Sequence, residues 1–397
     1  MARTTRGAEA RWRTSKEVLR HIRRRPGITR AELGRELGLS SGSTTETVTR
    51  LRGARLLAEV PASPTGRGRP SAVLVPHPSG PVVLALELRH EDWRCAVAGV
   101  DGALGPVRAR RHASRERRQV LDQLAQAVRE MRRCYGRRLR AVSVAAAGAV
   151  HDGTVVHAST LQWGPLDMAG LVDDTGLPLL VGNDAACAGV AEARAGAAAS
   201  ARTCLHLLVD VGIGGSLIVD GQPLRGARGA SGEFGHLALG ERHLRCPCGA
   251  TGCWDLEVDG RALARHLGVA PPEDPHTFAR MLLARAPRRS AAAAFTAVSS
   301  ALGSGIAGLV NALDPEVVSL GGLAPQLRDA ARNAFDSAYL DGLMGFRRAD
   351  PPPVVRAAFA DDGALRGAAE LGLDLATSES GIMEWMDEGA EYAGTSG

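Results

Sequence analysis

The residues best suited to metal chemistry lie close together in the middle of the chain: His236, Cys246, Cys248 and Cys253. One imidazole and three thiolates form a complete tetrahedral ligand set for zinc, and the soft sulfur atoms argue against magnesium or calcium. Because the protein would fill every position, we expect a structural ion that shapes a loop and activates no water. A redox-active cysteine pair or chance clustering is the alternative interpretation. The other four cysteines are scattered, which is typical of small buried residues in a reducing compartment.

Charge is distributed unevenly along the 397 residues. Residues 1–71 contain 16 Lys and Arg and 6 Glu, a net charge of +10, whereas the whole chain carries +5, so residues 72–397 carry −5. A compact basic segment at one end is suited to neutralising nucleic-acid phosphates. Charge alone favours an ordinary solvated surface, so the choice depends on the fold predicted for this segment.

The basic segment has the pattern of a helix-turn-helix. Apolar residues at helical spacing predict short helices from Ser15 onward, and the third begins at Ser41 after a tight turn. Thr44, Val48 and Leu51 share its inward face. Two short helices joined by a tight turn place the second one in the major groove of double-stranded DNA. The residues predicted to face DNA are Ser41, Ser43, Thr45, Glu46, Thr49 and Arg50.

A wing is predicted directly after the third helix. Residues 57–60 and 72–75 have the composition of strands, and a loop rich in glycine and proline joins them. Arg67 and Arg69 in this loop offer fixed positive charge to phosphates or to a narrow minor groove. An interdomain linker with incidental arginines is the alternative, but the position after the recognition helix favours a wing.

From residue 80 onward, strands and helices alternate in two similar series, which indicates an α/β body with two lobes. We expect the body to span 80–376 behind a winged helix-turn-helix at 15–76, with a basic arm at 1–14 and a flexible tail at 377–397. The first apolar run is too short to cross a bilayer, so we expect a cytoplasmic protein without a membrane partner. The expected elements include strands at 82–88, 93–100, 141–147, 203–209 and 317–320, and helices at 120–132 and 291–313.

Several motifs together resemble the ROK family of repressors, open reading frames and sugar kinases. They are Gly232-Glu233-Phe234-Gly235-His236 with the cysteines that follow, Asn183-Asp184-Ala185, and the stretch from Asp210 to Ser216. The resemblance covers about residues 15–373. It implies a two-lobed, actin-like, ribonuclease-H-like sugar kinase fold that is often dimeric or tetrameric. In the repressor branch of the family, a winged helix-turn-helix precedes this fold.

The resemblance also implies a sugar pocket. Carboxylates and an amide can each bridge adjacent sugar hydroxyls, and His236 would direct one ring nitrogen at zinc and the other at the ligand. Taken alone, Asn183-Asp184 is better explained as a loop cap. The family usually has Glu at the position of Asp255, so this sugar contact is altered here. The residues implied to bind ligand are Gly148, Asn183, Asp184, Glu233, His236 and Asp255.

The phosphate loops depart from the kinase pattern. Where family kinases have Asp-x-Gly-Gly-Thr, this chain has Glu87-Leu88-Arg89-His90-Glu91, and Asp210-Val211 replaces Gly-Thr in the second loop. Side chains, two of them acidic, would stand where bare backbone approaches the phosphates. Asp184 would then be a vestigial catalytic base, and we expect no enzyme activity.

The sequence therefore predicts a transcriptional regulator, most simply a repressor of carbohydrate-related genes, that binds operator DNA as a homodimer or homotetramer. A sugar or sugar phosphate in the cleft would be its effector, and structural zinc its cofactor. One alternative is a sugar kinase that keeps a DNA-binding appendage. Another is a regulator whose body binds no small molecule and serves as a zinc-supported dimerisation platform.

Overall fold

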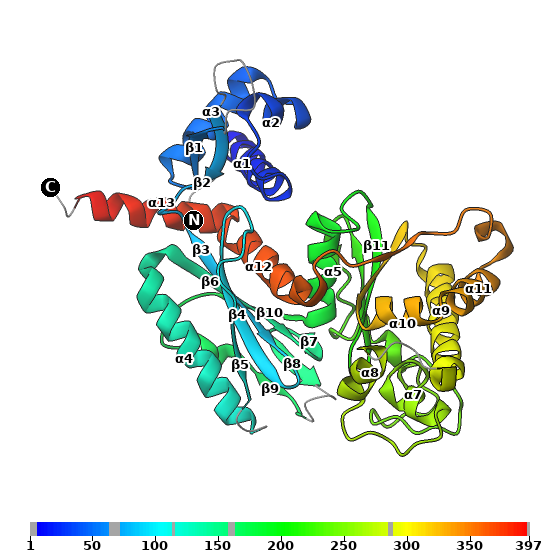
Figure 1. Cartoon of the computed structure of the whole chain (residues 1–397). Coiled ribbons are helices and arrows are strands. Elements are labelled where there is room, and N and C mark those ends of the chain that lie inside the picture. Colours follow the sequence, from blue (N-terminus) through cyan, green and yellow to red (C-terminus); the bar gives the residue numbers. More distant parts are fainter. Residues whose placement is uncertain (1–5, 63–71, 113–115, 158–162, 285–288, 395–397) are drawn as a thin grey trace.

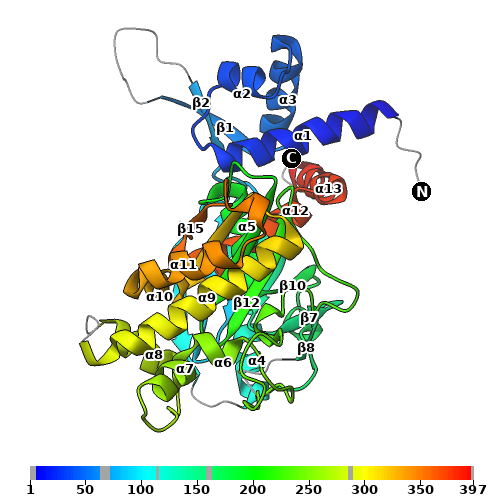
Figure 2. The same ribbon diagram turned by 90° about the vertical axis from the view of Figure 1, so that its right-hand side faces the viewer.

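The computed structural model describes residues 6–62, 72–112, 116–157, 163–284 and 289–394. A small N-terminal head stands at one end of a two-lobed body, and the C-terminal helix lies beside the head (Figure 1). Figure 2 shows the same arrangement from the side, with the head again at one end of the body.

The head is a winged helix-turn-helix. Thr29 caps the second helix in a capping box with Glu32, and the Ser40 side chain caps the third by accepting the Ser43 amide. Val18, Leu33 and other apolar side chains form a buried core between the helices. The first helix begins earlier than expected, at Arg6, so much of the expected basic arm at 1–14 is helical. The elements are α1 (Arg6–Arg24), α2 (Arg30–Glu36), α3 (Ser41–Gly53) and the antiparallel strands β1 (Leu57–Pro61) and β2 (Ala72–Pro76).

The N-terminal lobe is built on a five-stranded sheet in the order β10-β6-β3-β4-β5. Its strand β3 is buried on both faces: Leu84 and Leu86 face α4, and Val83 and Ala85 face α12. The elements are β3 (Val82–Leu88), β4 (Asp92–Gly99), β5 (Arg108–Arg111), α4 (Arg117–Tyr135), β6 (Leu139–Ala146) and β10 (Leu179–Asn183), with a smaller sheet of β7 (Ala149–His151), β8 (Thr154–His157) and β9 (Leu166–Asp167).

The C-terminal lobe repeats this plan with the order β15-β14-β11-β12-β13. In both sheets two parallel pairs are followed by two antiparallel pairs, as the similar sequence series predict. Its central helix α9 is apolar and long enough to cross a membrane, but Val298, Leu302 and Ile306 are buried in this lobe's core. The elements are β11 (Thr203–Val209), β12 (Ile213–Val219), β13 (Gln222–Pro223), α6 (Asp255–Val258), α7 (Gly260–His266), α8 (Pro275–Ala284), α9 (Ala292–Leu313), β14 (Val317–Gly322), α10 (Ala324–Ala330), α11 (Arg332–Gly342) and β15 (Val354–Arg356).

Two helices connect the lobes. α5 (Asp184–Ala195) packs on the C-terminal sheet, α12 (Gly363–Ala376) packs on the N-terminal sheet, and the two helices cross between the sheets (Figure 1). They approach so closely that a Cβ at Gly367 would lie 1.7 Å from the carbonyl oxygen of Cys187. A larger residue at Gly367 would therefore force the helices apart.

The C-terminal segment corrects one expectation. Residues 377–397 were expected to form a flexible tail, but Glu379–Gly394 forms the helix α13. Ile382 and Trp385 are buried in the same core as Val18 and Leu51 of the head. The expectation failed because the acidic composition of this segment hides two apolar residues at helical spacing.

Candidate functional site

The recognition helix α3 presents a polar face to solvent. Five of the six residues predicted to face DNA are exposed, and Thr44, Val48 and Leu51 are buried as expected. Arg50 differs, because its guanidinium group donates to Ser15 at 3.2 Å and lies over the Trp12 ring. The exposed residues are Ser41, Ser43, Thr45, Glu46 and Thr49. Arg67 and Arg69 lie outside the described residues.

The four predicted metal ligands come together. The ligand atoms of His236, Cys246, Cys248 and Cys253 all lie within 4.8 Å of one another. The sulfur atoms of Cys248 and Cys253 are 3.7 Å apart, and His236 Nδ1 is 3.8 Å from Cys246 Sγ. A tetrahedral zinc ion with Zn–S bonds of about 2.3 Å requires ligand separations of about 3.8 Å. The donor set and its spacing therefore fit zinc.

The cysteine loop is tightly turned and anchored to the core. The Cys246 amide donates to the Ala250 carbonyl at 2.9 Å, and Gly252 has the positive φ of 71° that the turn before Cys253 requires. The next residue, Trp254, is buried in the C-terminal lobe and donates to the Ala301 carbonyl at 2.9 Å. An ion bound here would hold the loop that carries His236 against this core.

A cavity of about 590 Å³ lies between the two lobes. Its lining includes residues from both lobes, so its shape depends on how the lobes close. All six residues implied to bind ligand line it: Gly148, Asn183, Asp184, Glu233, His236 and Asp255.

Asn183 makes structural hydrogen bonds in addition to its place in the cavity. Its side-chain oxygen accepts the Ala186 amide at 2.9 Å, which caps α5, and its nitrogen donates to the Gly148 carbonyl at 3.1 Å. The capping role expected for an isolated Asn-Asp pair is thus present. Asn183 fixes the loop that carries Gly148 and the start of the helix that carries Asp184.

The pKa of Asp184 is shifted strongly by its place in the cavity. Its removal from bulk water raises its pKa to about 7, an effect opposed by a hydrogen bond from the Ala185 amide and reinforced by the negative charge of Asp210. A carboxyl group with this pKa exchanges protons near neutrality, so it can either donate or accept a hydrogen bond to a ligand hydroxyl.

Asp255 and His236 lie next to each other in the cavity lining. Asp255 Oδ1 accepts the Ile213 amide at 2.7 Å, and its other oxygen lies 3.5 Å from His236 Nδ1. His236 Nε2 lies 3.7 Å from Glu233 Oε2. The imidazole therefore connects the cysteine cluster on its Nδ1 side with a cavity carboxylate on its Nε2 side.

The cavity lining also contains ion-paired side chains. His276 Nε2 lies 2.7 Å from Asp210 Oδ1, and both residues line the cavity, as does Arg89. Arg89 donates two hydrogen bonds of 2.6 Å to Asp92. Glu91, which was expected to repel phosphate here, is not among the described residues that line the cavity and pairs instead with Arg111 at 2.9 Å.

The sequence interpretation missed several lining residues. His276 and Arg280 belong to α8, Gln326 to α10, and residues 359–362 precede α12. Arg94 was also missed: it donates to Glu87 at 2.9 Å and to Asp362 at 2.9 Å, which ties β3 to the segment before α12. Burial raises the pKa of Glu87, and the Arg94 charge opposes that rise. No local sequence motif identifies these residues, because they reach the cavity only through tertiary folding.

Comparison with known proteins agrees with this architecture. Residues 84–374 match the ROK family and residues 13–68 match the MarR family. A glucokinase of Streptomyces coelicolor is 28% identical over 272 residues, covering 64% of this chain and 85% of the glucokinase. A xylose repressor of Caldicellulosiruptor bescii is 29% identical over 187 residues, covering 44% of this chain and 47% of the repressor.

Solved structures share the fold. The crystal structure of a ROK family transcriptional regulator, a homologue of the Escherichia coli MLC protein, superposes with a TM-score of 0.75 at 21% identity and covers 96% of this chain and 99% of its own. A ROK family glucokinase from Streptomyces griseus, solved with glucose and AMPPNP, covers 73% of this chain and 99% of its own with a TM-score of 0.63 at 23% identity. The match spans the body and the head together, and the chain belongs to the ROK family, with an N-terminal winged helix of the MarR type.

Proposed function

We propose that this protein is a transcriptional regulator of carbohydrate-related genes whose cleft binds a sugar or sugar phosphate without phosphorylating it. The observation that carries the proposal is the composition of one cavity lining. Asp184, Glu233 and Asp255 offer carboxylates to sugar hydroxyls, and Asp210, in the loop where the family's kinases bind phosphate, is paired with His276. A carboxylate in that position disfavours ATP by charge repulsion.

The structure offers a direct route from the cleft to the head. α12 begins next to the cavity lining residue Asp362 and ends at the head, where Arg23 of α1 donates to Glu370, Asp374 and Thr377 at 3.2 Å each. A ligand that shifts the lobes would move α12 relative to α5, and the buried Arg23 contacts would transmit that movement to α1. This coupling is reciprocal, so DNA must alter ligand affinity by the same factor.

Zinc and self-association complete the proposal. A structural zinc ion at the His236 cluster would keep Glu233 and Asp255 in register with the sugar. A homodimer or homotetramer would place two recognition helices on an inverted-repeat operator. We expect the protein to act in the cytoplasm.

A direct test selects binding sites from a random duplex pool and then titrates the selected DNA by fluorescence anisotropy, with glucose, xylose, N-acetylated amino sugars and their phosphates added in turn. We expect at least one of these compounds to change DNA affinity, and the same compound to stabilise the folded chain against heat. DNA binding that is indifferent to all of them would favour a body that serves only as a dimerisation platform.

A sugar kinase is the second candidate, because a glucokinase is 28% identical over 272 residues and Asp184 has a pKa suited to a catalytic base. Coupled ADP-release assays with the same sugars decide between the two. Sugar-dependent ADP release that is abolished by Asp184→Asn would establish the kinase and contradict our proposal.

A further inference from the structure

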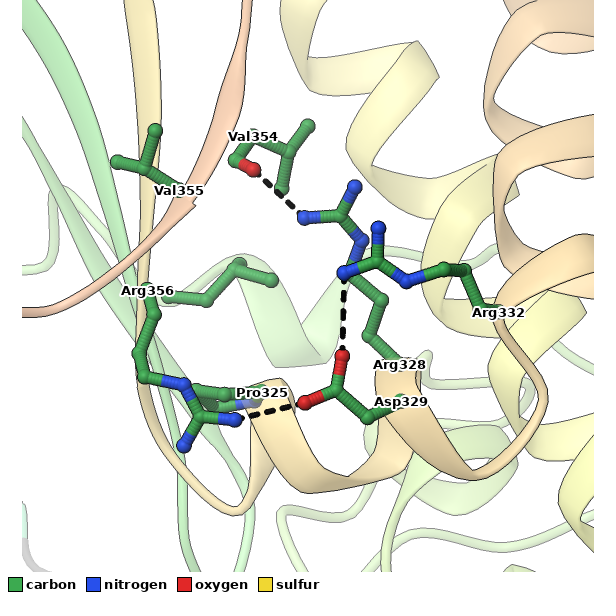
Figure 3. A pocket seen from close by; sticks show the side chains of 8 residues that line it. Pro325, Arg328, Asp329, Arg332, Val354, Val355 and Arg356 are labelled. Atoms are coloured by element: carbon green, nitrogen blue, oxygen red, sulfur yellow. Dashed lines mark hydrogen bonds and ion pairs between the residues drawn. The ribbon is translucent and has the colours of Figure 1, made fainter.

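A second cavity, of about 360 Å³, lies outside the cleft on the C-terminal lobe. It is formed where α10 and the start of α11 face the edge strand β15, and Figure 3 shows three arginine side chains directed into it. They are Arg328, Arg332 and Arg356. Neither the family resemblance nor the proposed function assigns a role to this site.

Arg328 is fixed in position by three contacts. It donates to the Val354 carbonyl at 2.6 Å and to Asp336 at 3.3 Å, and its guanidinium carbon lies 5.0 Å from the centroid of the Phe335 ring. Its side chain is only 18% exposed. Little conformational freedom therefore remains for it to lose when a ligand binds.

The other two arginines share one carboxylate. Asp329 accepts a hydrogen bond from Arg356 at 2.7 Å through one oxygen and from Arg332 at 3.3 Å through the other (Figure 3). A guanidinium group has five N–H donors, and these contacts use one from each arginine. Among the described residues that line the cavity, three arginines face this single carboxylate, which leaves a net charge of +2.

We propose that this cavity binds a small phosphate monoester. The planar donors of Arg332 and Arg356 suit the oxygen atoms of a phosphoryl group, and the excess of positive charge in the lining favours an anionic ligand. Pro325 and Val355 provide an apolar surface for the carbon skeleton. The volume lies in the range of small-molecule pockets.

The site lies directly behind one wall of the cleft. Gln326 of α10 lines the cleft, whereas Arg328 and Asp329 of the same short helix line this cavity. The chain that leaves β15 at Arg356 reaches the cleft lining at Phe359. A phosphate ester bound here can therefore alter the cleft without entering it, and this inference does not rest on the identity of the cleft ligand.

The test measures binding of inorganic phosphate and glycerol 3-phosphate to the full chain by isothermal titration calorimetry, with glycerol and sodium chloride of equal ionic strength as references. We expect glycerol 3-phosphate to bind and glycerol not to bind. Replacing both Arg332 and Arg356 by Gln should weaken binding at least about tenfold, because each removes charge-assisted hydrogen bonds. Arg202→Gln is the matched control: it removes an exposed arginine of the same lobe that is paired with Asp220 and should leave binding unchanged.

Asp329→Asn gives a test of opposite sign, since it removes the negative charge that competes for both arginines and should tighten phosphate binding. Equal affinity in the wild type and the double arginine variant would place the phosphate elsewhere and overturn the proposal. The same conclusion follows if the wild type does not distinguish either phosphate from chloride, or if Asp329→Asn leaves the affinity unchanged.

Discussion

The indole nitrogen of Trp385 donates a 2.6 Å hydrogen bond to the backbone carbonyl of Ala54, 331 residues away in the sequence. Ala54 is the C-cap residue that follows α3, so α13 satisfies a carbonyl group at the C-terminal end of the recognition helix. The Arg137 guanidinium lies 5.1 Å from the centre of the Trp385 ring, which also connects this side chain to the body.

Trp385→Ala should therefore destabilise the head. Loss of a buried indole and its hydrogen bond costs about 3–5 kcal/mol, and we expect this as a lower urea midpoint for the head by circular dichroism. Met386→Ala on the same helix is the control, because Met386 is exposed and its loss should change stability by less than about 0.5 kcal/mol. Equal effects of the two substitutions would contradict the packing of α13 on the head.

The Arg23 contacts predict a measurable energetic coupling between head and body. In a double-mutant cycle of Arg23→Ala and Asp374→Ala, we expect an interaction energy on the order of 1–3 kcal/mol, because each single change removes one ion-pair partner from a buried network that also contains Glu370 and Arg194. The response of DNA affinity to effector should shrink in both variants. Arg24→Ala, at the exposed neighbouring position, should change neither quantity. Additive single effects would show that the two residues are not coupled.

Asp184 and His206 change the free energy of unfolding in opposite directions as pH rises. The pKa of Asp184 is raised to about 7, so between about pH 4 and 7 the folded state binds more protons than the unfolded state, and this group makes stability fall as pH rises. Burial lowers the pKa of His206 to about 4, so this group makes stability rise as pH increases towards 6.5.

Asp184→Asn should remove the Asp184 contribution and leave the His206 contribution in place. We expect its free energy of unfolding to rise more steeply between pH 4.5 and 6.5 than that of the wild type, by up to about 1.4 kcal/mol per pH unit. Chemical denaturation at a series of pH values measures both slopes. Identical slopes would rule out the raised pKa of Asp184.

Cys253→Ser should remove zinc. One of the four ligands is lost, so we expect the purified variant to contain far less zinc by elemental analysis and to unfold at a lower temperature. Cys134→Ser is the control, because Cys134 is exposed and far from the cluster in sequence. A wild-type protein without zinc after purification in zinc-containing buffer would refute the metal assignment.

The wing arginines should contribute to DNA affinity through phosphates. Arg67→Ala and Arg69→Ala should each weaken binding and lower the slope of log affinity against log salt by about 1. The exposed Arg118 on α4 provides a control of equal charge change. Unchanged affinity and slope in both wing variants would remove the wing from the DNA interface.

Much of the fold follows from the sequence because its signals are local. The apolar period of α3, the caps at Thr29 and Ser40, and the alternation of strands and helices each require only neighbouring residues. The cysteine spacing is equally local, since the ligands span 18 residues and a short loop must bring them together.

The remaining features depend on contacts between distant segments. Ile382 and Trp385 are the apolar residues by which α13 packs on the head, which lies at the other end of the sequence. No local pattern identifies the head as their partner. The Asp210–His276 pair and the Arg94 bridge likewise join elements that meet only after the lobes have folded. Arg50 faces α1 because an aromatic ring is available there, which helical periodicity alone does not reveal.

The placement of α13 affects how the protein matures during synthesis. A ribosome releases the N-terminal head long before it translates residues 379–394, so Ile382 and Trp385 reach their places in that head only after the body has emerged. Nascent or prematurely terminated chains would carry a DNA-reading surface with an incomplete interior. Competence to bind DNA would thus be reached only after the body, the portion proposed to sense the effector, has been made.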